Sequence, residues 1–372
     1  MPKQTALITL MPLVLLMACA QATPMPSPTV VTPTVVPTNT PMPTVIPTAT
    51  AVPLPKFEPV AATEQIKRLA RGVNFGNMLE TPNYEGEWGV KIEDGDFARI
   101  KQAGFTHVRV PIRWSAHAAA QAPYALEAAF LARVTQVVRM SLDAGLGVVI
   151  NMHHYDELFA ATDEVHQQRF IGLWRNIAQH FKDYPADLVF ELLNEPNGTL
   201  NASAWNGLLG QTLAVVRETN PTRNVVIGTA EFGGVRALKD LKLPPNDDHL
   251  IVTVHYYLPF QFTHQGADWV SGSNKWLGTV WEGSSPDRGS IEFDFNEVDA
   301  WAKANKRPIW LGEFGAIYKA DMESRVRWTS FIVREAERRG WGWAYWEYAA
   351  NYAVFDRSTN SFKAPLLKAL IP

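Results

Sequence analysis

The amino-acid sequence predicts an α/β protein with a single (β/α)8 TIM barrel, preceded by a disordered linker rich in proline and threonine. Eight short apolar or β-branched runs are spread over residues 57–372, and polar residues and then a helical pattern commonly follow them. Most runs are continuously apolar, as in parallel strands buried on both faces. Ten of the 26 prolines lie between residues 20 and 55. The domain itself therefore has an ordinary proline content.

The eight runs are the predicted strands of the barrel. They are Gly72–Phe75, His107–Val110, Gly147–Ile150, Leu188–Leu192, Asn224–Ile227, Leu250–Val254, Pro308–Leu311 and Gly342–Trp346. Helices are predicted between them at Glu93–Ala103, Glu127–Ala144, Asp163–Phe181, Ala204–Thr219 and Asp321–Arg339. Eight such repeats favour a barrel over a doubly wound sheet. The first strand has only a G-x-x-x-G spacing, which does not favour a dinucleotide-binding fold.

The first 56 residues predict export and a tether. Lys3 precedes an apolar run, Ala6–Ala18, that is too short to span a bilayer and is typical of a signal peptide. Residues 1–19 end in Leu-Met-Ala-Cys, which resembles the lipobox of bacterial lipoproteins, so Cys19 is predicted to carry a lipid; simple secretion is the alternative. Residues 20–56 form the linker, because residues 20–55 contain no charged side chain and cannot bury a core. Residues 57–372 are predicted to form the (β/α)8 domain.

Composition excludes several classes of protein. With 34 Lys and Arg against 37 Asp and Glu, no basic excess indicates nucleic-acid binding. A single cysteine excludes an internal disulfide framework and a multi-cysteine metal site. The 13 Trp, 10 Tyr and 18 Phe are more aromatic side chains than a core needs. No cofactor is expected, and the protein is expected to be a monomer.

Side chains suited to chemistry follow every predicted strand. Catalysis in a barrel takes place at the carboxyl ends of the strands. Read in order, these ends carry Asn77, Glu80, Arg109, His153, His154, Asn194, Glu195, Glu231, His255, Tyr257, Glu313 and Trp346. A lone polar residue after a strand is commonly a loop anchor, but eight strand ends of this kind on one face predict an active site.

Two of these side chains are glutamates on strands that face each other across the barrel. Glu195 ends the fourth strand and Glu313 ends the seventh. Two carboxyl groups with aromatic neighbours are what glycosidic-bond hydrolysis requires: one protonates the leaving oxygen, and the other attacks or stabilises the anomeric carbon. The residues alone do not decide which glutamate has which role.

The ordered motifs resemble glycoside hydrolase family 5. They are His107–Pro111, Asn151–His154, Leu193–Pro196, His255–Tyr257, Gly312–Gly315 and Tyr345–Glu347. The segment Gly76–Glu80 and the loop from His255 to Trp269 resemble endo-β-1,4-glucanases of thermophilic bacteria, some of which also cut mannan. The resemblance implies a retaining endo-β-1,4-glucanase that cleaves internal bonds of soluble β-glucans, such as carboxymethyl cellulose and mixed-linkage β-glucan. An endo-β-1,4-mannanase, or a bifunctional enzyme acting on glucomannan, is the alternative.

The resemblance also assigns roles to the residues. Glu195 is the general acid/base and Glu313 the nucleophile, and in a retaining enzyme their carboxyl groups lie about 5–5.5 Å apart. The supporting residues are Arg109, His153, Asn194, His255 and Tyr257. The expected substrate contacts are Asn77, Glu80, His154, Phe232, His264, Trp269 and Trp346. Phe232 stands where close relatives often carry a tryptophan.

Two rival interpretations are weaker. A metal-dependent barrel hydrolase would draw its ligands from His153, His154, Asp156, His255 and His264, but the first strand lacks the usual His-x-His pair. On an extended chain, the adjacent His153 and His154 are expected to point to opposite sides. A non-catalytic carbohydrate-binding protein would normally lack one of the two glutamates. In the loop after Tyr257, Trp276 and Trp281 are expected either to contact sugar or to pack the loop onto the barrel.

Overall fold

A computed structural model of the chain describes residues 53–372. The predicted signal peptide, Cys19 and most of the predicted linker lie outside the described residues. Within residues 53–372, no helix is both long enough and apolar enough to cross a bilayer.

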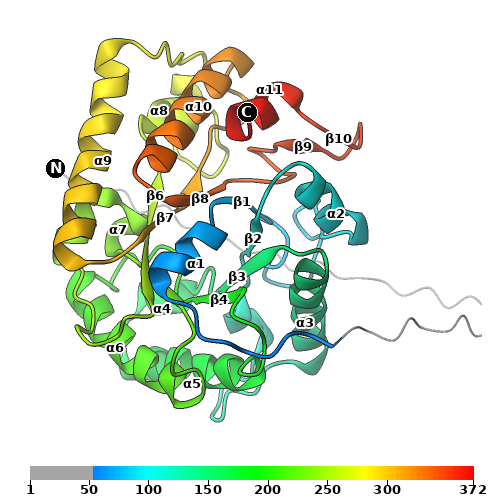
Figure 1. Cartoon of the computed structure of the whole chain (residues 1–372), viewed down its shortest axis with the longest axis vertical. Helices are drawn as coiled ribbons and strands as arrows, with labels where there is room; N and C mark the ends of the chain where they lie inside the picture. The colour runs from blue at the N-terminus through cyan, green and yellow to red at the C-terminus, as the bar shows by residue number, and fades with distance from the viewer. Residues whose placement is uncertain (1–52) are drawn as a thin grey trace, which may run out of the picture. The chain divides into compact units, whose positions relative to one another are not determined.

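The predicted barrel is confirmed. Eight parallel strands close in chain order, with β1 pairing to both β2 and β8 (Figure 1). Each lies at a predicted run: β1 (Arg71–Asn74), β2 (His107–Val110), β3 (Gly147–Asn151), β4 (Leu188–Glu191), β5 (Val225–Gly228), β6 (Leu250–Tyr256), β7 (Ile309–Phe314) and β8 (Gly342–Tyr345). All eight strands are almost completely buried, which explains why the runs are continuously apolar.

The five predicted helices are also present. They are α2 (Asp94–Gln102), α3 (Ala128–Asp143), α5 (Glu164–His180), α6 (Ala202–Thr219) and α10 (Met322–Arg338). The remaining helices are shorter or less regular in pattern: α1 (Ala62–Arg68), α4 (Asp156–Ala160), α7 (Ala230–Gly233), α8 (Phe260–Thr263), α9 (Ser285–Asn305) and α11 (Ala364–Leu370). A two-stranded ribbon of β9 (Phe355–Asp356) and β10 (Ser361–Phe362) precedes α11.

The chain between Tyr257 and Pro308, where no helix was predicted, contains the long helix α9. Its start carries a capping box, in which Ser284 and Asp287 satisfy each other's backbone amides, and a proline in the first turn. Few of its residues are apolar, and Ile291, Phe295 and Val298 are the large ones that it buries. The true insertion is therefore the shorter segment between β6 and α9.

The amino-terminal end of the barrel is closed by α1. Ala62 and Ile66 of α1 pack with Leu69 against inward-facing residues of the strands, among them Val149 and Trp310. Figure 1 shows α1 drawn across the ring of strands. Since this end is filled, the carboxyl ends of the strands are left to form an open pocket.

Candidate active site

A pocket of about 960 Å³ lies at the carboxyl ends of the strands. All but one of the predicted site residues line it: Asn77, Glu80, His153, His154, Asn194, Glu195, Phe232, His255, Tyr257, His264, Trp269, Glu313 and Trp346. The exception is Arg109, which is fully buried and contacts the pocket residues from inside the barrel.

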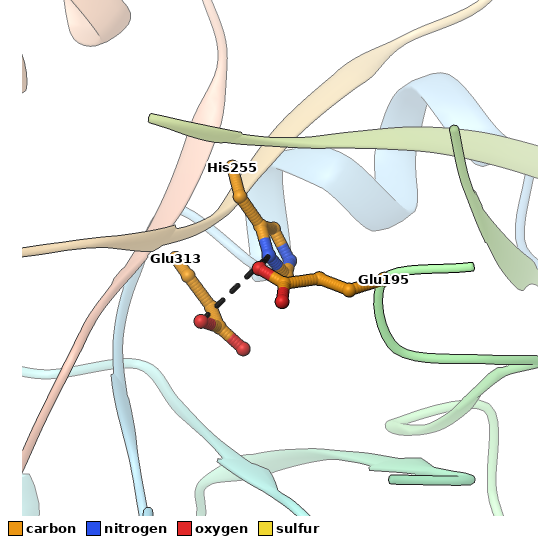
Figure 2. Close-up of side chains that lie close together, drawn as sticks. All are labelled: Glu195, His255 and Glu313. Atoms are coloured by element: carbon orange, nitrogen blue, oxygen red, sulfur yellow. Dashed lines mark hydrogen bonds and ion pairs between the residues drawn. The ribbon is translucent and has the colours of Figure 1, made fainter. Parts of the chain in front are cut away.

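Glu195, His255 and Glu313 form the centre of the pocket, where they come from the ends of β4, β6 and β7. Nδ1 of His255 lies 2.7 Å from Oε1 of Glu195 and 3.7 Å from Oε2 of Glu313. One oxygen of each glutamate lies within 4.8 Å of the other. Figure 2 shows the two carboxyl groups extending toward each other, with the imidazole beside both. This spacing agrees better with the separation of about 5–5.5 Å in retaining glycosidases than with the 6.5–9.5 Å of inverting ones.

Arg109 on β2 holds Glu313 from below. Its Nη1 donates to Oε1 of Glu313 at 2.6 Å, and its Nε and Nη2 donate to both oxygens of Glu191 at 2.6 and 2.8 Å. Burial opposes the charge of Arg109, but Glu191 and Glu313 hold its pKa above the usual value. Nη2 and Nη1 also donate to Oδ1 of Asn194 and Oδ1 of Asn74, at 2.8 and 2.9 Å. Sequence reasoning missed Glu191, although a carboxylate within an apolar strand is a signal for a buried ion pair.

The second oxygen of Glu313 accepts a hydrogen bond from the hydroxyl of Tyr257 at 2.9 Å. Burial and the neighbouring Glu313 raise the pKa of Tyr257 well above its usual value, so this hydroxyl stays a donor. Burial alone would lower the pKa of His255, but Glu313 and the hydrogen bond to Glu195 raise it above the usual value. Arg109 and Tyr257 thus both donate to Glu313, and His255 lies beside it.

Five residues that follow strand ends have left-handed backbone conformations without being glycine. Their φ angles are 68° at Asn77, 53° at His154, 45° at Glu195, 56° at Glu231 and 60° at Phe232, and all five line the pocket. Such conformations are costly for side chains with a Cβ and concentrate at functional sites. The strain therefore marks the same region as the carboxyl pair.

The expectation that His153 and His154 point to opposite sides is wrong. The left-handed φ of His154 turns the chain, so both rings line the pocket with their centroids 4.5 Å apart. His153 stacks on Trp346 at 5.8 Å with an interplanar angle of 9°. Its Nδ1 lies 3.2 Å from the amide of Asn151, rather than at a carboxylate. Burial and nearby positive charge keep the pKa of His153 well below its usual value.

The loop after β6 supplies the opposite wall. His264 stacks on Phe260 at 4.0 Å, and Trp269 lies edge-on to His264 at 6.4 Å with 56% of its surface exposed. Trp281 is buried in the core and Trp276 packs edge-on against Phe260, so neither lines the pocket. These two rings pack the loop, whereas Trp269 is free to meet a ligand.

Glu80, an expected substrate contact, lines the pocket but is almost completely buried. Its side chain is 1% exposed, and its carboxyl accepts backbone hydrogen bonds from Asn77 and, at 2.8 Å, from Met78. Burial raises the pKa of Glu80 to about 7, although those hydrogen bonds lower it. Glu80 thus fixes the turn that presents Asn77. Further lining residues that sequence reasoning missed are Trp88, Arg236, Asn351 and Tyr352.

Among the His, Cys, Asp and Glu side chains of residues 53–372, one group of three or more lies close enough together to share a metal ion. It consists of Glu195, His255 and Glu313. It contains only one of the five residues that the metal-dependent alternative named. Both oxygens of Glu313 already accept hydrogen bonds, from Arg109 and Tyr257. Arg109 and His255 already supply positive charge at this centre, which disfavours a metal cation there. The three side chains therefore fit a site of proton transfer better than a metal site.

Glu347 lies directly after Trp346 and is fully buried. One oxygen accepts the N–H of Tyr352 at 3.0 Å, and the other has no hydrogen-bond partner among the described residues. Burial raises the pKa of Glu347 to about 8, against the effect of the Tyr352 N–H, and Glu80 raises it further. The buried carboxyl group of Glu347 therefore links two residues that line the pocket: Trp346, its neighbour in the chain, and Tyr352, its hydrogen-bond donor.

We predict that Glu347→Gln makes stability less dependent on pH. The pKa of Glu347 is about 8 in the folded protein and 4.5 as its ordinary value. The folded state therefore binds this proton more tightly, and its stability falls as pH rises from about 4.5 to about 8. Glutamine keeps the shape without the proton. Urea unfolding measures the free energy of unfolding at pH 5 and at pH 9. Between these pH values it should fall less for the variant than for the wild type, by up to a few kcal/mol.

The control for this experiment is Glu297→Gln, which changes an exposed carboxylate on α9. It should keep the wild-type difference between the two pH values. An unchanged difference in Glu347→Gln would mean that Glu347 does not hold its proton in the folded protein.

Comparison with known proteins places this site in a family. The family model Cellulase (glycosyl hydrolase family 5) matches residues 70–352. Endoglucanase H of Acetivibrio thermocellus is 36% identical over 313 residues, covering 82% of this chain but only 33% of that protein, so this chain spans about a third of its relative. Solved structures of Cel5A from Thermotoga maritima, in complex with mannotriose and with cellobiose, are each 51% identical with a TM-score of 0.82, covering 83% of this chain and 100% of theirs. The chain belongs to glycosyl hydrolase family 5.

Proposed function

We propose that the chain is a retaining endo-β-1,4-glucanase acting on soluble β-glucans. The observation that carries the proposal is the pair Glu195 and Glu313, with oxygens within 4.8 Å of each other and with different hydrogen-bond partners. Retaining glycosidases need two carboxyl groups that are close together, one ionised and one carrying a proton.

Glu313 acts as the nucleophile in this proposal. Arg109 and Tyr257 donate to its two oxygens and fix the orientation of the carboxyl group. Glu313 attacks the anomeric carbon, a bond forms between that carbon and a carboxylate oxygen, and the bond to the leaving oxygen breaks.

Glu195 acts as the general acid and then the general base. Its Oε1 lies 2.7 Å from Nδ1 of His255, which holds the carboxyl group in position. In the first step Glu195 gives its proton to the leaving oxygen. In the second step water attacks the anomeric carbon, gives its proton to Glu195 and releases Glu313.

Asn194 binds the sugar on which the reaction takes place. Its Oδ1 is occupied by Arg109 at 2.8 Å, which leaves the two Nδ2 hydrogens to donate to a sugar hydroxyl. Trp346 provides the apolar surface for the same sugar, and Trp269 and Phe232 provide exposed rings elsewhere in the pocket.

The names of the relatives support glucan as the substrate. They are called cellulase and endoglucanase, and Cel5A of Thermotoga maritima has been solved with cellobiose as well as with mannotriose. Glucose and mannose differ only in the configuration at the 2-hydroxyl, close to Asn194. Glucanase activity is therefore the proposal, and mannan is the comparison substrate in its test.

We further propose that residues 1–19 export the chain and that a lipid on Cys19, followed by the linker 20–56, tethers the domain of residues 57–372 to the outer cell surface. The support is the apolar run that ends in a lipobox-like Leu-Met-Ala-Cys, followed by a segment without charge. The action of the enzyme on a polymer that cannot enter the cell agrees with this location.

Purified protein is expected to release reducing sugar from carboxymethyl cellulose and mixed-linkage β-glucan faster than from mannan. Assays on these polysaccharides and on glucomannan, at equal enzyme concentration, compare the rates. Hydrolysis of mannan alone would refute the glucanase proposal and leave the mannanase alternative.

Glu313→Ala and Glu313→Gln are expected to lower kcat by a factor on the order of 10⁴ or more, because the covalent step is lost. Azide should restore turnover of Glu313→Ala with an inverted product. Glu195→Ala should instead keep activity on aryl glycosides whose leaving group needs no proton. Glu297→Gln is the control with wild-type rates. Wild-type rates in Glu313→Ala would assign the nucleophile elsewhere.

Cys19→Ser is expected to abolish lipid attachment. Cells that express the full chain are grown with labelled palmitate, and the label should appear in the wild-type protein and be absent from the variant. An unlabelled wild-type protein in the medium would mean simple secretion.

A further inference from the structure

The chain makes a sharp turn directly at Glu195. The φ angle of Glu195 is 45°, in the left-handed region, where a residue with a Cβ is rarely found. The next residue is Pro196, and a proline normally leaves the residue before it in an extended conformation. Glu195 therefore has a backbone conformation that contacts of its neighbours must hold.

Asn197 supplies such a contact. Its side-chain Nδ2 donates to the backbone carbonyl of Glu195 at 2.8 Å, and its own carbonyl accepts the N–H of Leu200 at 3.1 Å. A short amide side chain that bonds the nearby main chain stabilises a turn. The partner of Asn197 is thus the main chain of Glu195 and not its carboxyl group.

The turn is also fixed on its outer sides. The carbonyl of Pro196 accepts the N–H of Phe232, on α7, at 3.3 Å. The carbonyl of Phe159, on α4, accepts the N–H of Thr199 at 2.9 Å. At Gly198, φ is 62° and a Cβ would come within 2.5 Å of the oxygen of Phe159. The turn is therefore held between α4 and α7.

Glu195 depends on its backbone for orientation more than Glu313 does. Glu313 accepts hydrogen bonds from Arg109 and Tyr257 on its two oxygens. In the described part of the chain, His255 is the one side chain that is hydrogen-bonded to the carboxyl group of Glu195. The side chain of Glu195 is also 26% exposed, against 6% for Glu313. A carboxyl group with a single partner takes its direction largely from its main chain.

We propose that Asn197 is a positioning residue for Glu195. It holds the left-handed turn, and the turn sets the direction from which the carboxyl group meets the leaving oxygen. The proposal rests on the proposed role of Glu195 as the general acid, and it extends that role to a side chain that does not line the pocket. Loss of the contact should misplace the proton donor and leave the nucleophile in place, so that only proton transfer is weakened.

The test measures kcat/KM, which reports the first chemical step, on two aryl cellobiosides. A dinitrophenyl group leaves without a proton, whereas a phenyl group needs one. Asn197→Ala should lower kcat/KM about tenfold or more for the phenyl substrate and leave the dinitrophenyl substrate close to wild type. An unfolded fraction of the protein lowers both values equally, so it does not change their ratio.

Two further variants isolate the hydrogen bond. Asn197→Ser keeps a donor and should restore part of the loss, whereas Asn197→Asp keeps the shape but places an acceptor beside the carbonyl and should restore none. The matched control is Asn206→Ala. Nδ2 of Asn206 also donates to a backbone carbonyl, that of Asp240, at 2.8 Å, and Asn206 does not line the pocket. This variant should keep the wild-type ratio.

A double-mutant cycle shows whether Asn197 acts through Glu195. In the Glu195→Ala background, Asn197→Ala should have no further effect on the phenyl substrate. A full additional loss there, or a wild-type ratio of the two substrates in every Asn197 variant, would overturn the proposal. The proposed function fails by a different result, because equal losses on both substrates in Glu195→Ala would mean that Glu195 is not the acid.

Discussion

The buried guanidinium of Arg109 is the interaction on which the rest of the site depends. Its five N–H donors have a fixed planar geometry, and they reach side chains of β1, β4 and β7 at once. A charge buried this deeply would be very costly unless it were paired and fully hydrogen-bonded. Glu191 and Glu313 supply the pairing, and each of them needs Arg109 for the same reason. The barrel therefore fixes Glu313 through strands rather than through loops.

Charge balance around this group sets the protonation of its neighbours. Arg109 and the raised pKa of His255 offset the carboxylates of Glu191 and Glu313. Burial raises the pKa of Glu80 to about 7 and that of Glu347 to about 8, and the neighbouring Glu313 raises both further. The carboxyl groups under the pocket thus divide into two that are held by Arg109 (Glu191 and Glu313) and two with raised pKa that hold loops (Glu80 and Glu347).

The sequence could predict the strands and the carboxyl pair because both are properties of a closed parallel barrel. Continuous apolar runs must be buried on both faces, and a side chain after such a run must lie at the open end. The direction in which a loop side chain turns is not fixed in this way. His154 faces the pocket because of one left-handed φ, and Glu80 turns inward to backbone amides. The helix α9 was missed because its apolar residues are gathered on one face less clearly than those of α2 or α10.

This division between strands and loops also separates chemistry from specificity. Arg109, Asn194 and Glu313 are bound to one another at strand ends, so none can change without disturbing a buried charge network. Trp88 and Trp269 lie on loops and are partly open to solvent; Trp88 contacts the ring of His154, and Trp269 contacts those of His264 and Tyr352. Neither takes part in the charge network around Arg109, so substitution there is expected to leave the carboxyl pair in place. The fold thus separates a centre held by strands from a rim that loops can vary.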